Sequence, residues 1–256
     1  HLKAAYEAMA PLREYLAGAG IAPATVVTGT VFTTDDIHAI SRGMARAIEE
    51  GDVPTASDIE LCTAPGQKTA CYDDGAGNSD ESGKLRVCVG HGRSVSDQPE
   101  AFYEIHMKIT LPIFQQGTAP YLIDVTGGDI ELDDDGKAKV QRTEDVCAAL
   151  TVPKDKPMPA GGWPVVLYGH GTGGWFNSFT FQGRTTSLVT GASFPEPGHD
   201  RASSVASLPG GDEGFAMLSF DQVQHGPRRG GSAVSAESLF FNFLNPKAAR
   251  DNTLQG

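Results

Sequence analysis

The stretch from Trp163 to Gly174 constrains this chain most, because it joins a short apolar run directly to a dense cluster of glycines. Residues 165–168 are apolar and largely β-branched or aromatic, which is typical of a strand buried on both faces. Four of the next six residues are glycine, so the backbone can turn sharply and bring its N–H groups close to a ligand. This order predicts a ligand site at the carboxyl edge of an open α/β sheet.

The residues after this run, His170-Gly171-Thr172-Gly173-Gly174, resemble the oxyanion-hole turn of secreted bacterial esterases and lipases of the α/β-hydrolase fold. The resemblance implies that the backbone N–H of Thr172, which follows His170 and Gly171, stabilises the charge that develops on an ester carbonyl oxygen. His170 is expected to support the turn through its ring nitrogens rather than to act as a base. The competing interpretation is a glycine-rich connection from strand to helix that carries no chemistry.

The composition of the chain argues against nucleic acid as a partner and against a transmembrane segment. The chain has 256 residues, a net charge of −12 and a pI of about 4.9, which argues against nucleic acid, because phosphate binding needs clustered Lys and Arg. No apolar run approaches the ~20 residues of a transmembrane helix, so no transmembrane segment is expected. The chain opens directly into helix-like sequence, and we interpret this as the result of a removed leader or of a longer N-terminus.

Four cysteines fit disulfide bonds and an oxidising compartment, so the expected location is secreted or periplasmic. Cys62 and Cys71 flank a short Pro-Gly segment, whereas Cys88 and Cys147 lie in strand-like runs. The expected pairs are therefore Cys62–Cys71 and Cys88–Cys147. Four free thiols in a cytosolic enzyme remain the alternative. No Cys-x-x-Cys occurs, so a zinc site is not expected.

An acidic loop contains Asp73, Asp74, Asp80 and Glu81, whose carboxylates are the hard oxygen ligands that calcium prefers. The loop lacks the spacing of an EF-hand, so a solvated loop is the preferred interpretation. No cofactor is expected elsewhere in the chain.

Residues 1–100 are expected to form an N-terminal α+β extension, loop-rich from residue 52 onward. Its apolar spacing predicts a helix over 2–16 that Pro11 interrupts or restarts, a strand over 25–34 and a helix over 37–48.

Residues 101–256 are expected to form the first part of an α/β-hydrolase domain, whose sheet is incomplete within this chain. The patterns predict strands over 102–114, 140–152, 165–168 and 215–220, and helices over 238–245 and 248–255. Pro112 lies near the end of the first of these strands, which suggests an edge position.

Two pairs of residues beside the predicted strands are candidates for the site. Trp175 and Phe176 follow the glycine turn and either cover a substrate cleft or pack the next helix. Asp221 and His225 follow the predicted strand over 215–220, four residues apart. They form either a catalytic Asp–His pair or, as the hydrolase resemblance implies, a structural brace for their loop, because the family's triad residues come later in the chain. A metal-dependent hydrolase using His170, Asp221 and His225 is a weaker alternative, since their spacing matches no recognised metal motif.

A nucleophile elbow of the form Gly-x-Ser-x-Gly is absent from the sequence, since Ser94, Ser193 and Ser232 each lack a required glycine. We therefore expect a serine hydrolase of carboxylic esters whose nucleophile lies in residues beyond this chain or in a second polypeptide that completes the sheet. A folded species that is strictly monomeric would contradict this expectation. The alternative is a non-catalytic secreted binding module that retains the hydrolase fold.

Overall fold

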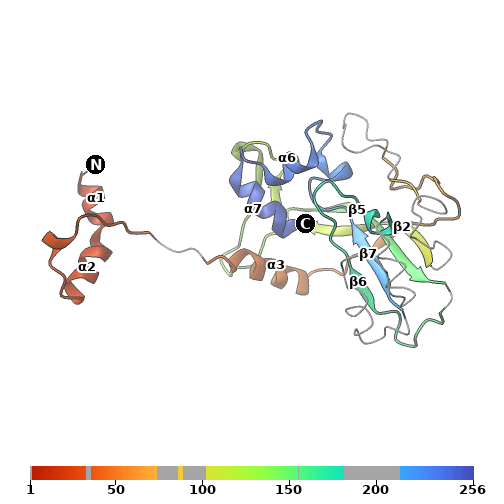
Figure 1. Cartoon of the computed structure of the whole chain (residues 1–256), viewed down its shortest axis with the longest axis horizontal. Coiled ribbons are helices and arrows are strands. Elements are labelled where there is room, and N and C mark those ends of the chain that lie inside the picture. Colours follow the sequence, from red (N-terminus) through yellow and green to blue (C-terminus); the bar gives the residue numbers. More distant parts are fainter. Residues whose placement is uncertain (1, 33–35, 74–85, 89–101, 155, 182–213) are drawn as a thin grey trace, which may run out of the picture. The chain divides into compact units, whose positions relative to one another are not determined.

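The computed structural model describes residues 2–32, 36–73, 86–88, 102–154, 156–181 and 214–256, and divides into two units, His1–Ala39 and Ile40–Gly256 (Figure 1). The first unit contains α1 (Leu2–Ala8), α2 (Ala10–Gly18) and the 3₁₀ turn η1 (Pro23–Thr25). Pro11 lies in the first turn of α2, where its missing N–H would have no helical partner in any case. The prediction that Pro11 divides this helical region is therefore confirmed.

The strand predicted over residues 25–34 is wrong for the part of that run that the structure describes. Thr25 ends η1, and residues 26–32 belong to no helix or strand. Val27 is 99% exposed and Phe32 is 76% exposed. β-Branched residues favour a strand only where a partner strand and an apolar face are available, and the described part of the first unit contains no strand.

A five-stranded mixed sheet forms the centre of the second unit, in the order β1-β2-β5-β7-β6 (Figure 1). All neighbouring strands are antiparallel except β6 and β7, which are parallel. The strands are β1 (Ala56–Leu61), β2 (Phe102–Ile113), β5 (Arg142–Pro153), β6 (Val165–Leu167) and β7 (Ala216–Phe220). A mixed sheet with helices confirms the α/β class, and the predicted strands over 102–114, 140–152 and 215–220 are all present.

Shorter elements complete the described parts of this unit. A two-stranded sheet pairs β3 (Gln115–Gly117) with β4 (Gly127–Ile130). The helices are α3 (Ala39–Glu49), α6 (Ala236–Phe241) and α7 (Pro246–Gln255), and the 3₁₀ turns are η3 (Asp124–Thr126), η4 (Ser178–Phe181) and η5 (Gly226–Arg229). No helix in the described ranges has the length and apolar character needed to cross a membrane.

The division between the two compact units falls between Ala39 and Ile40, at the start of α3. The reason is β1, a strand that the loop-rich composition of residues 52–100 did not predict, which pairs with β2 in the register Leu61↔Ile105. Helix α3, predicted over 37–48, also belongs to the second unit, and its Met44 and Ala47 pack against Phe114. Residues 40–88, as far as they are described, therefore extend the sheet domain.

Burial on both faces, expected for residues 165–168, is wrong. Val165 is 59% exposed and Leu167 is 64% exposed, whereas Val166 and Tyr168 pack against the core. Strand β6 pairs only with β7 among the described strands, so it lies at an edge of the sheet. A continuous apolar run has the same appearance in the sequence whether its second face is covered within the chain or left open.

The edge position expected for β2 is also wrong, because β2 lies between β1 and β5. Pairing with β1 ends at Ile109, whereas pairing with β5 continues through Pro112 to Ile113. Pro112 therefore lies beyond the end of β1, where its missing N–H removes no ladder hydrogen bond.

Helix α7 is held by buried polar side chains as well as by the packing of Leu254 on the core. Asp251 Oδ2 accepts the Ile130 N–H at 2.8 Å, and Asn252 Nδ2 donates to the Phe240 carbonyl at 2.9 Å. Both side chains are completely buried. The helix predicted over 248–255 is confirmed. The helix predicted over 238–245 is confirmed in part, because Ser235 caps α6 at its start and the chain leaves the helix at Asn242.

Candidate functional site

The glycine-rich segment after β6 forms a tight turn. The Gly174 N–H donates to the Gly171 carbonyl at 2.8 Å, and Gly173, at the third position, has a φ of 79°. These are the features of a type II turn, which requires a positive φ at that position and therefore favours glycine. Thr172 occupies the second position and is exposed. Among the described residues, no group accepts a hydrogen bond from the Thr172 N–H.

The N–H of Gly173 is engaged by the neighbouring loop. It donates to His225 Nε2 at 3.0 Å, across 52 residues of sequence. A Cβ at position 173 would lie 2.5 Å from Oε1 of the exposed Glu237 side chain, which would have to move, so the positive φ is the stronger reason for glycine here. The turn is thus fixed on both sides of Thr172.

His170 makes the reciprocal contact. Its Nε2 accepts the Gln222 N–H at 3.1 Å, and its own carbonyl accepts the Gln222 Nε2 at 2.8 Å. The rings of His170 and His225 meet edge to face with their centroids 4.8 Å apart. The turn after β6 and the loop after β7 are therefore joined through their histidines.

These contacts define the protonation of both rings. Because each Nε2 accepts a backbone N–H, each Nδ1 carries the proton and donates it, His170 to the Gly171 carbonyl and His225 to the Val223 carbonyl, both at 2.9 Å. Burial lowers the pKa of His170 to about 4, which keeps the ring neutral at physiological pH. Both nitrogens of each ring are engaged by backbone groups, which gives the histidines a bracing role and disfavours a base or metal ligand at either position.

Asp221, expected beside His225, directs its carboxylate elsewhere. Oδ1 accepts the Phe176 N–H at 2.9 Å and Arg86 Nη1 at 3.1 Å, and Oδ2 accepts Arg86 Nη2. Asp221 and Arg86 are each 1% exposed, so this is a buried, bidentate ion pair whose members are 135 residues apart. The pair ties the loop after β7 both to residues 86–88 and to the segment that follows the glycine turn.

Gly226, which follows His225, makes room for this ion pair. It has a φ of 50°, and a Cβ there would lie 2.6 Å from Arg86 Nη1 and 2.9 Å from its Cζ. Sequence reasoning missed Arg86, because it lies in a region with loop-like composition. The sequence held only an indirect signal. Asp221 follows a predicted buried strand, and a buried carboxylate needs a cationic partner, but nothing in the sequence identifies Arg86 as that partner.

Arg228 fixes the same loop from the other side. Its Nη1 donates to the Asp221 carbonyl oxygen at 2.8 Å, and its Nε lies 3.4 Å from Glu144 Oε2. Burial lowers the pKa of the Arg228 guanidinium, and the nearby Glu144 carboxylate opposes that effect. The cation thus stays paired within the structure.

The aromatic candidates have different positions. Phe176 is completely buried against His106, with ring centroids 4.9 Å apart, and under the Arg86 guanidinium at 5.0 Å. A fully buried ring does not line an open cleft, and Phe176 packs into the core beside Cys147 and Met217 rather than against a following helix. Trp175 is half-buried.

The predicted disulfide bonds exist, but both pairings are wrong. The bonds are Cys62–Cys88 and Cys71–Cys147. Cys62 directly follows β1 and is bonded to Cys88, whereas the sulfur of Cys71 is bonded to Cys147 in β5. Nearness in sequence is a poor guide here, because each bond joins segments that the sheet brings together.

Several predicted residues lie outside the described ranges. They are Asp74, Asp80 and Glu81 of the acidic loop, and the serines Ser94 and Ser193. Asp73 is described and half-buried. Ser232, the remaining elbow candidate, accepts the Val234 N–H in a local turn, at 3.2 Å.

Comparison with protein-family models, curated proteins and solved structures finds no match to this chain. The functional argument therefore depends on the geometry of the residues themselves.

Proposed function

We propose that this chain supplies the oxyanion-hole portion of a serine hydrolase that acts on carboxylic esters, of the esterase and lipase type. The observation that carries the proposal is the N–H of Thr172, an exposed residue that lies between engaged backbone groups at Gly171 and Gly173. A donor that is fixed in advance stabilises transition-state charge without any cost of reorganisation, and such a donor contributes roughly 2.7–4 kcal/mol.

The position of the turn supports an α/β-hydrolase sheet. The glycine turn follows β6 and the braced loop follows β7, which are parallel neighbours. Both segments therefore leave the sheet at the carboxyl ends of parallel strands, the edge at which open α/β sheets bind ligands.

In the proposed reaction, a serine hydroxyl attacks the ester carbonyl after a histidine base removes its proton, and an acidic residue orients that base. The Thr172 N–H then donates to the oxyanion of the tetrahedral intermediate. His170 and His225 hold the turn, and Arg86 neutralises the buried charge of Asp221. The nucleophile, its base and its acid belong to a continuation of this chain or to a second polypeptide.

Strand β6 supports the proposed second polypeptide or continuation. Among the described strands its outer edge has no partner, and Val165 and Leu167 expose apolar side chains on one face. A further strand that pairs with β6 would satisfy the backbone groups of that edge and allow this apolar surface to be covered. Secretion is part of the same proposal and is supported by the two disulfide bonds.

The decisive variant is Thr172→Pro. Proline is favoured at the second position of a type II turn, so the turn is retained while the N–H donor is lost. Hydrolysis of a p-nitrophenyl ester by the purified protein, with any polypeptide that copurifies, is expected to fall 10²–10³-fold in kcat. Thr172→Ala keeps the N–H and is expected to stay within about threefold of the parent. Equal activity of the proline variant and the parent would reject Thr172 as the donor.

Intact mass measured after treatment with a fluorophosphonate probe tests the reaction class independently. A probe adduct on a polypeptide associated with this chain is expected, because the probe labels activated serine nucleophiles. A single species near 26.9 kDa without an adduct would favour the alternative, a non-catalytic binding module with the same fold.

A further inference from the structure

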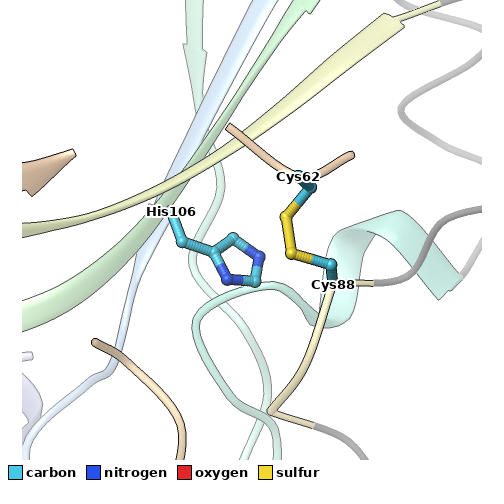
Figure 2. Close-up of side chains that lie close together, drawn as sticks. All are labelled: Cys62, Cys88 and His106. Carbon is cyan, nitrogen blue, oxygen red and sulfur yellow. A yellow bond between two sulfur atoms is a disulfide. The ribbon is translucent and has the colours of Figure 1, made fainter. Parts of the chain in front are cut away.

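The Cys62–Cys88 disulfide lies against a buried histidine. One ligand atom from each of Cys62, Cys88 and His106 lies within 4.8 Å of the other two (Figure 2). Figure 2 shows the His106 ring turned so that a ring nitrogen faces the disulfide. Cys88 and His106 are completely buried, and Cys62 is half-buried. Three ligands that zinc prefers are thus gathered from three segments, which no local spacing in the sequence reveals.

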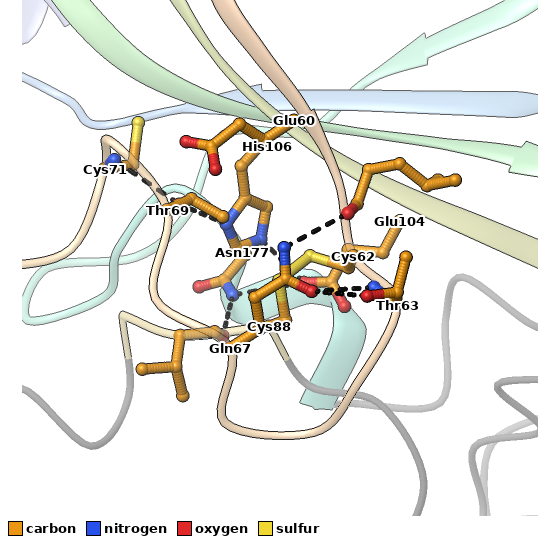
Figure 3. The surroundings of a disulfide bond; sticks show 12 residues. Glu60, Cys62, Thr63, Gln67, Thr69, Cys71, Cys88, Glu104, His106 and Asn177 are labelled. Atoms are coloured by element: carbon orange, nitrogen blue, oxygen red, sulfur yellow. Dashed lines mark hydrogen bonds and ion pairs between the residues drawn. A yellow bond between two sulfur atoms is a disulfide. The ribbon is translucent and has the colours of Figure 1, made fainter.

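The His106 ring is held in place on both sides. Nδ1 lies 3.0 Å from Thr69 Oγ1, and Nε2 lies 2.8 Å from Glu104 Oε1 (Figure 3). Asn177 Nδ2 approaches the same carboxylate oxygen at 3.3 Å. An imidazole that binds a metal through one nitrogen usually donates its other N–H to an oxygen, which fixes the tautomer and the ring orientation. Thr69 is positioned to accept that proton when Nε2 serves as the ligand.

The charges also suit a divalent ion. Two thiolates and a neutral imidazole around Zn²⁺ give a cluster of zero net charge, which avoids the large cost of an isolated charge in a buried position. Tetrahedral coordination at ordinary zinc bond lengths separates ligand atoms by about 3.4–3.8 Å, so modest side-chain rotations from the present arrangement suffice. The fourth position of such a site is left to a water molecule, because the carboxylate of Glu104, which lies 2.8 Å from His106 Nε2, would give the cluster a net charge of −1.

We propose that Cys62, Cys88 and His106 form a zinc-type metal site when the Cys62–Cys88 disulfide is reduced. A dithiol supplies two electrons and two protons, its own sulfurs joining as a disulfide while the Cys62–Cys88 bond opens to two thiols. Zn²⁺ then binds both sulfurs and displaces their two protons to solvent. Two sulfur–metal bonds thus replace the sulfur–sulfur bond. The segment that carries Arg86 and Cys88 therefore stays linked to Cys62, directly after β1, in both redox states. This site is independent of the proposed hydrolase activity.

The test uses the whole protein, reduced with dithiothreitol and desalted without oxygen. Titration with Co²⁺ is expected to bind one ion per chain, with thiolate-to-cobalt charge-transfer absorption and the visible bands of a tetrahedral site, and Zn²⁺ is expected to displace it. Alkylation of the reduced protein by N-ethylmaleimide, with and without Zn²⁺ and followed by peptide mapping, is expected to be slowed by the metal at Cys62 and Cys88 and to be unchanged by it at Cys71 and Cys147, which lie in the core. Absence of bound metal, or an effect of Zn²⁺ that is the same at all four cysteines, overturns the proposal.

A matched pair of variants tests the role of the imidazole. His106→Gln is expected to weaken zinc binding by at least tenfold, whereas His38→Gln, in the first unit, is expected to leave it unchanged. Unchanged affinity in His106→Gln overturns the assignment of this ligand. If the His106 variant does not fold, the alkylation pattern of the unaltered protein decides the question alone.

Discussion

His170 and His225 each accept a backbone N–H from the loop that carries the other, at 3.1 Å from Gln222 and 3.0 Å from Gly173. This exchange works only while both rings are neutral, because a protonated imidazole has no acceptor. The same two hydrogen bonds that hold the Thr172 turn therefore make it sensitive to acid.

The stability of the domain is expected to fall as the pH drops from about 6.5 to about 4. His170 has a folded pKa of about 4, below its ordinary value of 6.5, so the unfolded chain binds more protons in this window. The stabilisation is complete above pH 6.5, and about 3 kcal/mol is lost by pH 4. Urea unfolding at pH 7, 5.5 and 4 measures the loss. His170→Gln should reduce the dependence on pH, whereas the same steep slope in that variant would contradict the assignment.

Asp221→Asn is expected to destabilise the domain by about 3–5 kcal/mol, because it removes the carboxylate charge that pairs with the buried guanidinium of Arg86. Glu131→Gln is the matched control. Its carboxylate pairs with Lys139 at 3.3 Å, and both side chains are 49% exposed, so solvent screens the pair and its loss is expected to leave the unfolding midpoint nearly unchanged. Equal midpoints of the two variants in urea would show that the buried pair has no special role.

Gly226→Ala is expected to cost more than Gly136→Ala, although both glycines have a positive φ, of 50° and 74°. The backbone term is shared and amounts to about 1–2 kcal/mol. Only at position 226 does the added Cβ meet the Arg86 guanidinium, whereas nothing lies within 4 Å at position 136. The difference between the two unfolding free energies measures this crowding, and a difference of zero would argue against it.

Removal of the Cys71–Cys147 bond is expected to cost more than removal of the Cys62–Cys88 bond. The sequence separations are 76 and 26 residues, which give chain-entropy contributions of about 4.5 and 3.5 kcal/mol. Paired Cys→Ala variants measured by thermal unfolding test the order. The reverse order would indicate that packing around the sulfurs, rather than loop closure, determines the contribution.

The sequence predicted features that depend on neighbours along the chain. The alternation of residues 102–114 and the apolar spacing of residues 37–48 identified β2 and α3, since a half-buried strand and an amphipathic helix each leave a local pattern. The glycine cluster similarly identified the tight turn around Thr172.

Features that depend on distant parts of the chain escaped prediction. The exposure of Val165 follows from the strand order, and the partner of Cys62 follows from the pairing of β1 with β2. Arg86 looked like any surface cation, because its burial becomes evident only once Asp221 is placed beside it. In each case the deciding contact spans more than twenty residues, beyond the reach of periodicity.

The Arg86–Asp221 pair also affects the order of events during folding. Because 135 residues separate its members, the pair closes a long loop, and loop closure costs entropy before the contact can repay it. Strand β7 must dock on β5 before Asp221 reaches the guanidinium, so the turn around Thr172 is expected to become rigid only in the last stage of folding. A partly folded chain would then carry paired strands before this turn is held in place, which separates the two events in time.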